Sequence, residues 1–483
     1  MHVQKLENYI KDSAKLFESI ASEPWAQFLD SGQRIDDMSR LTGKIDTLVF
    51  SPQTTLVTKN EVTTIKTGNA ALEHSLENPF HLVAKAIERY QENVKANEHF
   101  NNQTKDQIKT AFHGGAIGYF GYELGRRVEV LPATANDDLK LPDMAIGIYE
   151  VAIVTCHDSL ETWLIDATGD NHQLVEQWLN IVSQYWRSKN DYSLDAKEKT
   201  ALKSWKAVSE LQENISRQEY EEKFDRVKQY LYEGDAYQIN LTKRFHVKVE
   251  GSAWASYLRM RQLSPAPFGA YMNFPFATIL SNSPEQFIEC YEGVVKTSPI
   301  KGTRPRDKDI LERDLALAQE LENSLKDRAE NVMIVDLLRN DFGKICEIGS
   351  VDVPELFAVK SFANVHHLIS QITGKLNSEN DALGLLAASF PGGSITGAPK
   401  KRAMEIIDEL EPHCRGVYCG AIGWIGFAGN MQTNIAIRTI TYKNGVAYFS
   451  AGGGVVIDSD CAEEHQEIMD KAAIMLSIVG VKK

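Results

Sequence analysis

Lys301 is the residue of this chain whose type and setting best suit covalent catalysis. It lies in the segment Ser-Pro-Ile-Lys-Gly-Thr-Arg-Pro-Arg at positions 298–306, where glycine and proline indicate a turn. An amine forms a bond to carbon only after it has lost its proton, so such a lysine needs a dry pocket or neighbouring cations. The segment therefore predicts a lysine nucleophile held by the backbone.

Two acidic segments have the spacing of a shared helix face. Asp327 and Glu330 are three residues apart, and Glu464, Glu467 and Lys471 are spaced three and four apart. Carboxylate oxygens are the ligands that Mg²⁺ prefers, so two such helices could share one cation together with a substrate carboxylate. The alternative is that both are solvated acidic faces, which is the usual place of exposed charges.

Three further polar residues stand in settings that suit a buried site. Arg438 is flanked by isoleucines at 435, 437 and 440, so we expect a buried strand that pairs its guanidinium with a carboxylate of a substrate or of the protein. His367 is an acid/base candidate or a core histidine with satisfied hydrogen bonds. Glu285 follows a predicted strand end, which suits either an acid pointing into a cleft or a surface turn.

Glycine-rich segments provide two places where backbone could approach a ligand. Residues 391–399, Pro-Gly-Gly-Ser-Ile-Thr-Gly-Ala-Pro, lead into a predicted helix, and Gly452, Gly453 and Gly454 follow a predicted strand. Each could equally be a tight turn. Neither has the spacing of a phosphate-binding loop or of a dinucleotide-binding fold.

The elements that position these residues are a mixture of helices and antiparallel strands. Ser216 and Glu219 form a predicted capping box for a helix that ends at Gly234, and from Tyr237 apolar residues alternate as in a half-buried strand. Further helices are expected near 312–339, 399–410 and 461–479. Further strands are expected near 277–281, 431–441 and 445–450, so the predicted class is mixed α/β with much antiparallel sheet.

Composition narrows the classes of partner. The 483 residues carry a formal charge of −14, which disfavours binding to nucleic acid, and 43% are hydrophobic, as in globular proteins. The six cysteines show no C-x-x-C pair, and neither a basic-then-apolar amino terminus nor a membrane-spanning run is present. We therefore expect a cytoplasmic protein with reduced thiols and no membrane partner. The chain divides into an amino-terminal region (1–185), a polar linker (186–210) and a catalytic region (211–483).

Six motifs occur in an order that resembles the chorismate-utilising enzymes. They are Ser-Pro-Glu-Gln-Phe at 283–287, Pro-Ile-Lys-Gly-Thr-Arg-Pro at 299–305, residues 327–341 from Asp-Arg-Ala-Glu-Asn to Arg-Asn-Asp, His-Leu-Ile-Ser at 367–370, residues 391–400, and Ala-Gly-Gly-Gly at 451–454. Residues 118–126 resemble the associated amino-terminal region. The resemblance implies a large α/β (α+β) fold like that of anthranilate synthase component I, a two-sheet β-sandwich flanked by helices.

Lys301 separates the branches of this family. Anthranilate synthase large subunits usually carry alanine in the Pro-Ile-x-Gly-Thr motif, whereas aminodeoxychorismate synthase component I commonly carries lysine. The resemblance therefore implies a Mg²⁺-dependent amination of chorismate at C4, in 4-aminobenzoate and folate biosynthesis, through a covalent intermediate on Lys301. The alternatives are an anthranilate synthase large subunit and a catalytically silent amino-acid-binding subunit.

The resemblance also implies roles for individual residues. Glu285 would be the general acid/base, with His367 near the reacting ring. Glu330 and Glu467 would ligate Mg²⁺ directly, with Glu464 and Asp327 behind them, although several relatives have glutamate where this chain has Asp327. The residues expected to hold the substrate are Tyr418, Arg438, Gly452, Gly453, Gly454 and Lys471, and Gln238 stands where isochorismate and salicylate synthases place a water-activating lysine.

Two further expectations concern regulation and the nitrogen source. A tryptophan pocket known in this family is matched loosely by Ser31, Met38, Ser39, Arg40, Pro267 and Phe268. No Gly-x-Cys-x-Gly turn, typical of a glutaminase, surrounds any cysteine. We therefore expect a separate glutamine amidotransferase subunit to supply ammonia derived from glutamine.

Overall fold

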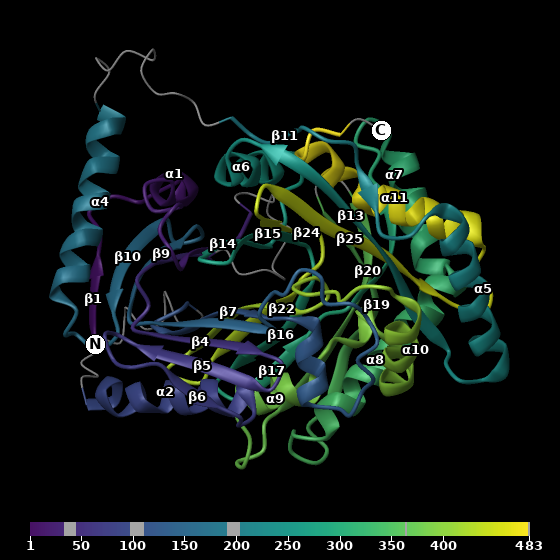
Figure 1. Cartoon of the computed structure of the whole chain (residues 1–483), viewed down its shortest axis with the longest axis horizontal. Coiled ribbons are helices and arrows are strands. Elements are labelled where there is room, and N and C mark those ends of the chain that lie inside the picture. Colours follow the sequence, from purple (N-terminus) through teal and green to yellow (C-terminus); the bar gives the residue numbers. More distant parts are fainter. Residues whose placement is uncertain (33–44, 97–110, 191–202, 363–364, 482–483) are drawn as a thin grey trace.

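The computed structural model describes residues 1–32, 45–96, 111–190, 203–362 and 365–481, and these form two large antiparallel sheets with helices around them (Figure 1). The predicted mixed class with two sheets flanked by helices is confirmed. Of the predicted linker, residues 191–202 lie outside the described part. No helix in the described ranges is long and apolar enough to cross a membrane.

The first sheet runs across the top of Figure 1 and contains 13 of the described strands. Its order is β1 (His2–Lys5), β10 (Glu161–Asp166), β9 (Val151–Cys156), β3 (Ile45–Val49), β2 (Ala26–Asp30), β14 (Phe268–Phe274), β15 (Ala277–Ser283), β24 (Thr439–Lys443), β25 (Val446–Val455), β13 (Gln238–Glu250) and β11 (Lys206–Ala207), with β12 (Gln212–Glu213) and β21 (Gly397–Ala398) also pairing with β13.

The second sheet lies below it and contains 12 of the described strands. Its order is β18 (Ile300–Pro305), β20 (Val365–Lys375), β17 (Val294–Thr297), β16 (Gln286–Tyr291), β23 (Met431–Ile435), β22 (Ala421–Gly426), β7 (Gly115–Phe120), β8 (Met144–Tyr149), β4 (Thr54–Lys59), β5 (Val62–Thr67) and β6 (Glu73–Ser75), with β19 (Asp352–Ser361) pairing with β20.

Both sheets contain strands from both ends of the chain. In the first sheet β2 pairs with β14, and in the second β7 pairs with β22. Strand β7 is buried on both faces: Ile117 and Tyr119 pack in the core cluster that also holds Met272 and Ile279 of the first sheet, whereas Ala116 and Phe120 face the larger core. The amino-terminal and catalytic sequence regions therefore share one framework of hydrogen bonds.

Helices cover the outer faces and the right-hand end of the sheets in Figure 1. They are α1 (Ser13–Phe17), α2 (Pro79–Ala96), α4 (His172–Asn190), α5 (Arg217–Glu233), α6 (Ala253–Leu263), α7 (Leu311–Asn323), α8 (Leu325–Gly343), α9 (Ala382–Ser389), α10 (Lys400–Leu410) and α11 (Cys461–Ile478), with short 3₁₀ helices η1 (Tyr122–Arg127) and η2 (Gly393–Ile395). Helix α11 packs on β25, and α7 and α8 pack on β18 and β20.

The predicted helix at the start of the catalytic region is confirmed, and the strand after it forms but is more buried than predicted. Ser216 accepts a hydrogen bond from the backbone of Glu219 in a complete capping box, and α5 ends at Gly234, whose φ of 82° is left-handed. Strand β13 begins at Gln238, one residue after the start of the predicted alternation. Residues 238–245 are buried on both faces, so the prediction of a half-buried strand is wrong for this part and holds only near the end of the strand.

Two predicted elements are wrong in their continuity. The helical run at 312–339 is two helices, because Ser324 ends α7 and caps α8 by accepting from the backbone of Asp327. The strand at 431–441 is likewise interrupted: β23 belongs to the second sheet and β24 to the first, so the chain crosses between sheets around Arg438.

Candidate active site

Lys301 lies on β18, so the turn predicted for this segment is wrong. The glycine that follows it lets this strand approach two helices. Lys301 stands opposite Leu368 of β20, and the register shifts between Lys301 and Thr303. Gly302 has a φ of 75°, and a Cβ there would lie 2.8 Å from both Asp327 Cγ and Leu321 Cδ1. Only glycine combines this left-handed backbone with so close an approach. The glycine that follows the lysine thus brings the strand against the start of α8.

Glu285 lies between β15 and β16, as predicted, and its side chain is buried. Burial raises the pKa of its carboxyl, while a hydrogen bond from Ser394 and the charges of Lys301 and Lys471 act in the opposite direction. A carboxyl with a raised pKa holds its proton to higher pH, as a general acid requires. Lys301 therefore lies close enough to Glu285 for its charge to act on the proton of that carboxyl.

The carboxylates of α8 and α11 face the same lysine. Burial raises the pKa of Glu330, and so do the charges of Asp327 and Glu467, whereas Lys301 and Lys326 lower it. Burial opposes the ionisation of Glu467, yet Lys471, Lys301 and Lys326 together lower its pKa. Glu330 and Glu467 thus share the field of Lys301, although they lie on different helices.

Glu464 is the most buried of the predicted metal ligands. Only 5% of it is exposed, and its Oε1 accepts a hydrogen bond of 2.7 Å from Ser459 Oγ. Burial raises its pKa, and the charge of Glu467 raises it further. The alternative of a fully solvated acidic face therefore does not hold for this residue.

The carboxylates of α8 and α11 are ligands of the kind that a hard cation binds, but they do not by themselves form a complete coordination shell. Within the described ranges, no group of three or more His, Cys, Asp or Glu side chains is close enough to hold a metal ion. Asp327 and Glu467 nevertheless repel Glu330, and Glu467 repels Glu464, while three lysines offset that repulsion. Carboxylate oxygens that repel one another are donors of the type that Mg²⁺ takes, with water or substrate completing the shell.

The three glycines of β25 allow side chains to approach its backbone closely. A Cβ on Gly453 would lie 2.7 Å from Glu464 Oε2, and one on Gly454 would lie 2.7 Å from Gln238 Nε2. Lys471 Nζ donates to the carbonyl of Gly452 at 3.0 Å and pairs with Glu467 at 2.6 Å. The glycines are therefore required by packing, and a tight turn, the alternative interpretation, is not what this segment forms.

Gln238 is completely buried beside this glycine strand. Neither its Oε1 nor its Nε2 has a hydrogen-bond partner in the described part of the chain. A buried unpaired amide is costly, so both atoms are available to a ligand.

Arg438 lies between β23 and β24 with a left-handed φ of 49°, so the predicted position within a strand is wrong. The isoleucines around it predict one strand, but Ile435 belongs to β23 in the second sheet and Ile440 to β24 in the first. Burial lowers the pKa of this guanidinium. Across the described residues it forms no ion pair with an acid of the protein, so its charge is left for another anion.

His367 lies within reach of the charge of Arg438. Burial lowers its pKa to about 4, and Arg438 adds to this effect. Thr303 Oγ1 is 2.9 Å from its Nδ1. At neutral pH the ring is therefore uncharged and acts through hydrogen bonds.

Tyr418 stands apart from the other predicted site residues. It is buried beside Arg415 and Glu411, and burial raises its pKa well above the usual range. Arg415 NH1 donates to the carbonyl of Ile395 at 2.8 Å, which ties this region to the loop of Ser394. Among the described residues, no polar contact joins Tyr418 to Lys301 or the carboxylates.

Two residues of the site were not predicted individually. Ser394 donates to Glu285, and Lys326 acts on Glu330, Glu464 and Glu467. Ser394 lies inside the motif at 391–400 and Lys326 directly precedes the motif at 327–341, but their partners are distant in sequence. We give the name Lys301 cluster to eight charged residues: Lys301, Glu285, Glu330, Asp327, Glu464, Glu467, Lys326 and Lys471.

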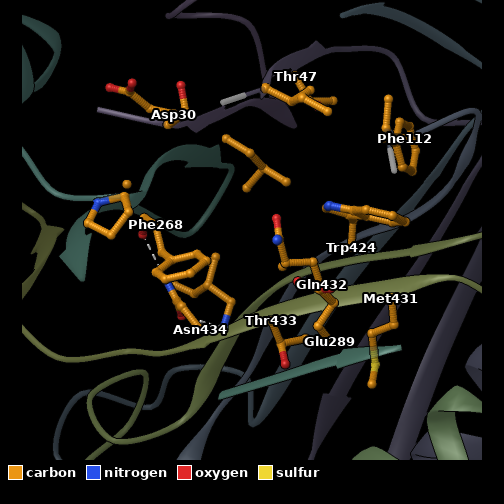
Figure 2. A pocket seen from close by; sticks show the side chains of 18 of the residues that line it. Asp30, Thr47, Phe112, Phe268, Glu289, Trp424, Met431, Gln432, Thr433 and Asn434 are labelled. Carbon is orange, nitrogen blue, oxygen red and sulfur yellow. Dashed lines mark hydrogen bonds between the residues drawn. The ribbon is translucent and has the colours of Figure 1, made fainter. Parts of the chain in front are cut away.

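A separate cavity of about 230 Å³ lies between the sheets (Figure 2). Ser31, Pro267 and Phe268, three of the residues predicted for an amino-acid pocket, line it, and Trp424 and Phe112 lie across from Phe268 in Figure 2. Met38, Ser39 and Arg40, the other three, lie outside the described residues.

Buried charges support one wall of this cavity. Asp30 accepts from Gly32 N at 2.8 Å, Tyr257 OH at 3.0 Å and Arg261 Nε at 2.6 Å. Asp46 accepts from the backbone and hydroxyl of Ser31 at 2.9 and 2.7 Å and pairs with His157 Nε2 at 2.7 Å. We call these six residues, Asp30, Ser31, Asp46, His157, Tyr257 and Arg261, the Asp30–Asp46 network.

Comparison with known proteins adds to this geometry. The family described as chorismate binding enzyme matches residues 42–477. Aminodeoxychorismate synthase component 1 of Klebsiella aerogenes is 44% identical over 455 residues, covering 94% of each chain, and the Escherichia coli K12 protein of that name is 43% identical over 462 residues, covering 95% of each. The crystal structure of anthranilate synthase component I from Streptococcus pneumoniae TIGR4 superposes with a TM-score of 0.75 at 30% identity, covering 92% of this chain and 94% of that one.

Proposed function

Because this chain belongs to the chorismate binding enzyme family, and is thus a chorismate-utilising enzyme, we propose that it aminates chorismate at C4 to give 4-amino-4-deoxychorismate. This product would serve 4-aminobenzoate and folate biosynthesis. The observation that carries the proposal is the position of Lys301, whose charge acts on Glu285, Glu330 and Glu467 together.

The proposed chemistry uses Lys301 as a temporary substituent on the ring. Its unprotonated Nζ attacks C2, the ring double bond shifts, and the C4 hydroxyl leaves as water with a proton supplied by Glu285. Ammonia then bonds to C4 and the new amine returns a proton to the Glu285 carboxylate, while the double bond shifts back and the C2–N bond breaks to release the lysine. Chorismate and ammonia thus give 4-amino-4-deoxychorismate and water, and the enolpyruvyl group is retained.

Cationic and backbone groups would hold the two substrate carboxylates. Arg438 supplies an unpaired guanidinium, and Lys471 lies against the glycine strand formed by Gly452, Gly453 and Gly454. Tyr418 would contribute from the side of Arg415. Glu330 and Glu467, backed by Glu464 and Asp327, would hold Mg²⁺, which when bound would neutralise the ring carboxylate.

The neighbourhood of Gln238 supports amination over addition of water. A buried carboxamide is neither a base nor an acid near neutral pH, so Gln238 cannot activate water for attack. Its two unpaired atoms instead suit hydrogen bonds to a neutral donor and acceptor on the ligand. His367, uncharged at neutral pH, would orient the ring without transferring a proton.

The nitrogen would come from a separate glutamine amidotransferase subunit. The two relatives are named component 1, which supports a second component. The six cysteines in the described part are free; Cys156, Cys290, Cys346 and Cys419 are buried, and none lies in the turn that a glutaminase nucleophile uses. Ammonium salts would replace that subunit in vitro.

A second function, amino-acid binding, is favoured by the cavity that Ser31 and Phe268 line. Its mixture of aromatic walls and buried charge suits an amino acid such as tryptophan. This binding would accompany catalysis in our proposal. In a catalytically silent subunit it would be the only function, and in an anthranilate synthase large subunit it would serve feedback control.

Product analysis tests the proposal. The purified chain is incubated with chorismate, Mg²⁺ and ammonium chloride, and pyruvate and product mass are recorded together. We expect consumption of chorismate without pyruvate, and a product that a downstream lyase converts to 4-aminobenzoate. Fluorescent anthranilate with equal pyruvate would instead identify an anthranilate synthase, and absence of turnover even with an amidotransferase would identify a silent subunit.

A further inference from the structure

Helix α7 presents leucines to solvent and a carboxylate to the protein. Leu311 and Leu315, one turn apart, are 71% and 60% exposed, and Ile310 just before the helix is 53% exposed. The buried residues of this helix are Asp314 and Leu321. A surface helix ordinarily does the reverse, with its apolar stripe inside.

The orientation of α7 is fixed by hydrogen bonds of Asp314. Arg306 Nε and NH2 each donate to this carboxylate at 2.8 Å, the backbone N of Asp307 donates at 2.9 Å, and His366 Nε2 lies 3.0 Å away. The hydrogen bond from Arg306 is the largest influence and lowers the pKa of Asp314 far below its usual range. Rotating the leucines inward would break all four contacts, so their exposure is built into the fold.

One end of α7 lies against the strand that carries the reactive lysine. Leu321, at the far end of the helix, is the residue that a Cβ on Gly302 would meet at 2.8 Å, and Lys301 is the adjacent residue. Arg306 and His366, which hold Asp314, directly follow β18 and precede His367 on β20. At a rise of about 1.5 Å per residue, Leu315 and Leu311 lie about 9 and 15 Å along the helix from Leu321. A protein bound to this face would therefore sit on the helix that packs against β18, the strand of Lys301.

We propose that Ile310, Leu311 and Leu315, the leucine face, form the docking site of the glutamine amidotransferase subunit that supplies ammonia. The inference rests on the proposed function. In neutral water ammonia is protonated, and ammonium has no lone pair with which to attack carbon. The subunit that releases ammonia must therefore bind near the chorismate site and keep the ammonia away from water. An exposed apolar face beside the catalytic strand meets that need.

Charges around the leucine face specify the kind of surface it fits. Arg313 pairs with Asp307 at 3.4 Å, and Glu320 pairs with Arg304 at 2.7 Å. The segment also exposes Asp309, Glu312, Glu322 and Lys308, so exposed acids outnumber exposed bases here. The complementary surface is therefore an apolar groove bordered by lysine or arginine.

The size of the leucine face indicates that it is the centre of a larger contact. Specific interfaces bury about 800 Å² on each partner, more than three side chains supply, and their energy is concentrated in a few central apolar residues surrounded by a polar rim. Placing carboxylates at Leu311 and Leu315 would put charge into that centre and add to an acidic rim.

The test compares two double variants with matched exposure. Leu311→Glu/Leu315→Glu changes the leucine face, and Leu72→Glu/Leu76→Glu changes leucines that are 58% and 68% exposed in the amino-terminal region. Three quantities are measured: turnover of chorismate with ammonium chloride, turnover with glutamine plus the purified amidotransferase subunit of the same organism, and the Kd of that subunit. We expect the first variant to keep its ammonium-dependent rate within about twofold, to lose at least about tenfold of its glutamine-dependent rate, and to bind at least about tenfold more weakly, a loss of about 1.4 kcal/mol.

The same measurements define the contrary results. Unchanged glutamine-dependent turnover and Kd in the first variant, or an equal loss in the control, would overturn the docking site. If the unmodified chain does not aminate chorismate with ammonium, the proposed function fails, but the Kd values still decide the docking. A dimer that becomes a monomer while glutamine-dependent turnover persists would assign the face to a second copy of this chain. Should the ammonium-dependent rate also fall, Leu315→Gln alone tests the same surface with less disturbance.

Discussion

The Lys301 cluster and the Asp30–Asp46 network both concentrate charge in the interior, but only one of them is saturated. In the network, Asp30 and Asp46 each accept three hydrogen bonds from protein groups. Around the cluster, Arg438 has no acid partner and Gln238 no hydrogen bond among the described residues, and carboxylates repel one another. Buried charged groups whose hydrogen bonds are all made within the protein stabilise the fold. Buried polar groups without protein partners are candidates for binding a ligand.

Removing Lys301 should have the largest effect on activity of the changes considered. For Lys301→Ala we expect kcat/KM with chorismate and ammonium to fall by about 10³-fold, because both the nucleophile and a cation acting on Glu285 are lost. The free energy of unfolding should change much less, because among the described residues Nζ forms no hydrogen bond or ion pair and acts on the carboxylates only through its charge. Steady-state kinetics and urea unfolding measure the two quantities.

Lys375→Ala, which removes a lysine 60% exposed at the far end of β20, is the control and should retain full activity. Near-normal turnover by Lys301→Ala would rule out the covalent step, and direct attack of ammonia would then replace it.

Replacing each of two arginines, Arg261 and Arg438, by methionine sharpens the comparison. Arg261→Met would leave Asp30 buried without its cation, so we expect the free energy of unfolding to fall by about 3 kcal/mol. Arg438→Met removes a buried cation with no acid partner, so stability should hold or rise, while KM for chorismate should increase about tenfold to a hundredfold through loss of a charge-assisted hydrogen bond.

Denaturant unfolding and chorismate titrations of both variants provide the measurement. If Arg438→Met proved as destabilising as Arg261→Met, Arg438 would be structural and the distinction between the two regions would fail.

The smallest expected effect is a shift in pH dependence for Ser394→Ala. The hydroxyl of Ser394 lowers the pKa of Glu285, so its removal leaves burial less opposed and raises that pKa further. A general acid is active while protonated, so the fall of kcat on the alkaline side should move to higher pH, with less than about tenfold change at the optimum. In Glu285→Gln that limb should disappear, and a limb that stays in place in Ser394→Ala would remove Glu285 from the role of acid.

Local rules in the sequence predicted the elements better than the contacts between them. The capping box of Ser216 and the strand that begins at Gln238 depend on neighbours within four residues, and both elements form. The burial of both faces of that strand depends on distant segments and was not predicted. Arg438 was misplaced because its isoleucine neighbours serve two different sheets. The partnership of Ser394 with Glu285 spans more than a hundred residues, and no local pattern reports it.

Helix α7 shows a second limit of pattern reading. Leucines such as those at 311 and 315 are ordinarily assigned to the core. In α7 the inward position is taken by Asp314, because its carboxylate contacts Arg306 and His366. A buried ion pair can outweigh the transfer of apolar side chains when several hydrogen bonds accompany it.

The order of strands has a consequence for how this chain is made. Strands β24 and β25 lie between β15 and β13, and β22 and β23 lie between β7 and β16, so late segments fill the middle of both sheets. A nascent chain leaving the ribosome therefore holds unpaired strand edges until β25, which ends at Val455, has been made. Long-range pairing of this kind is slow and exposes partly folded chains to aggregation. Yield in a recombinant host should therefore depend on translation speed and chaperones more than on the stability of the finished protein.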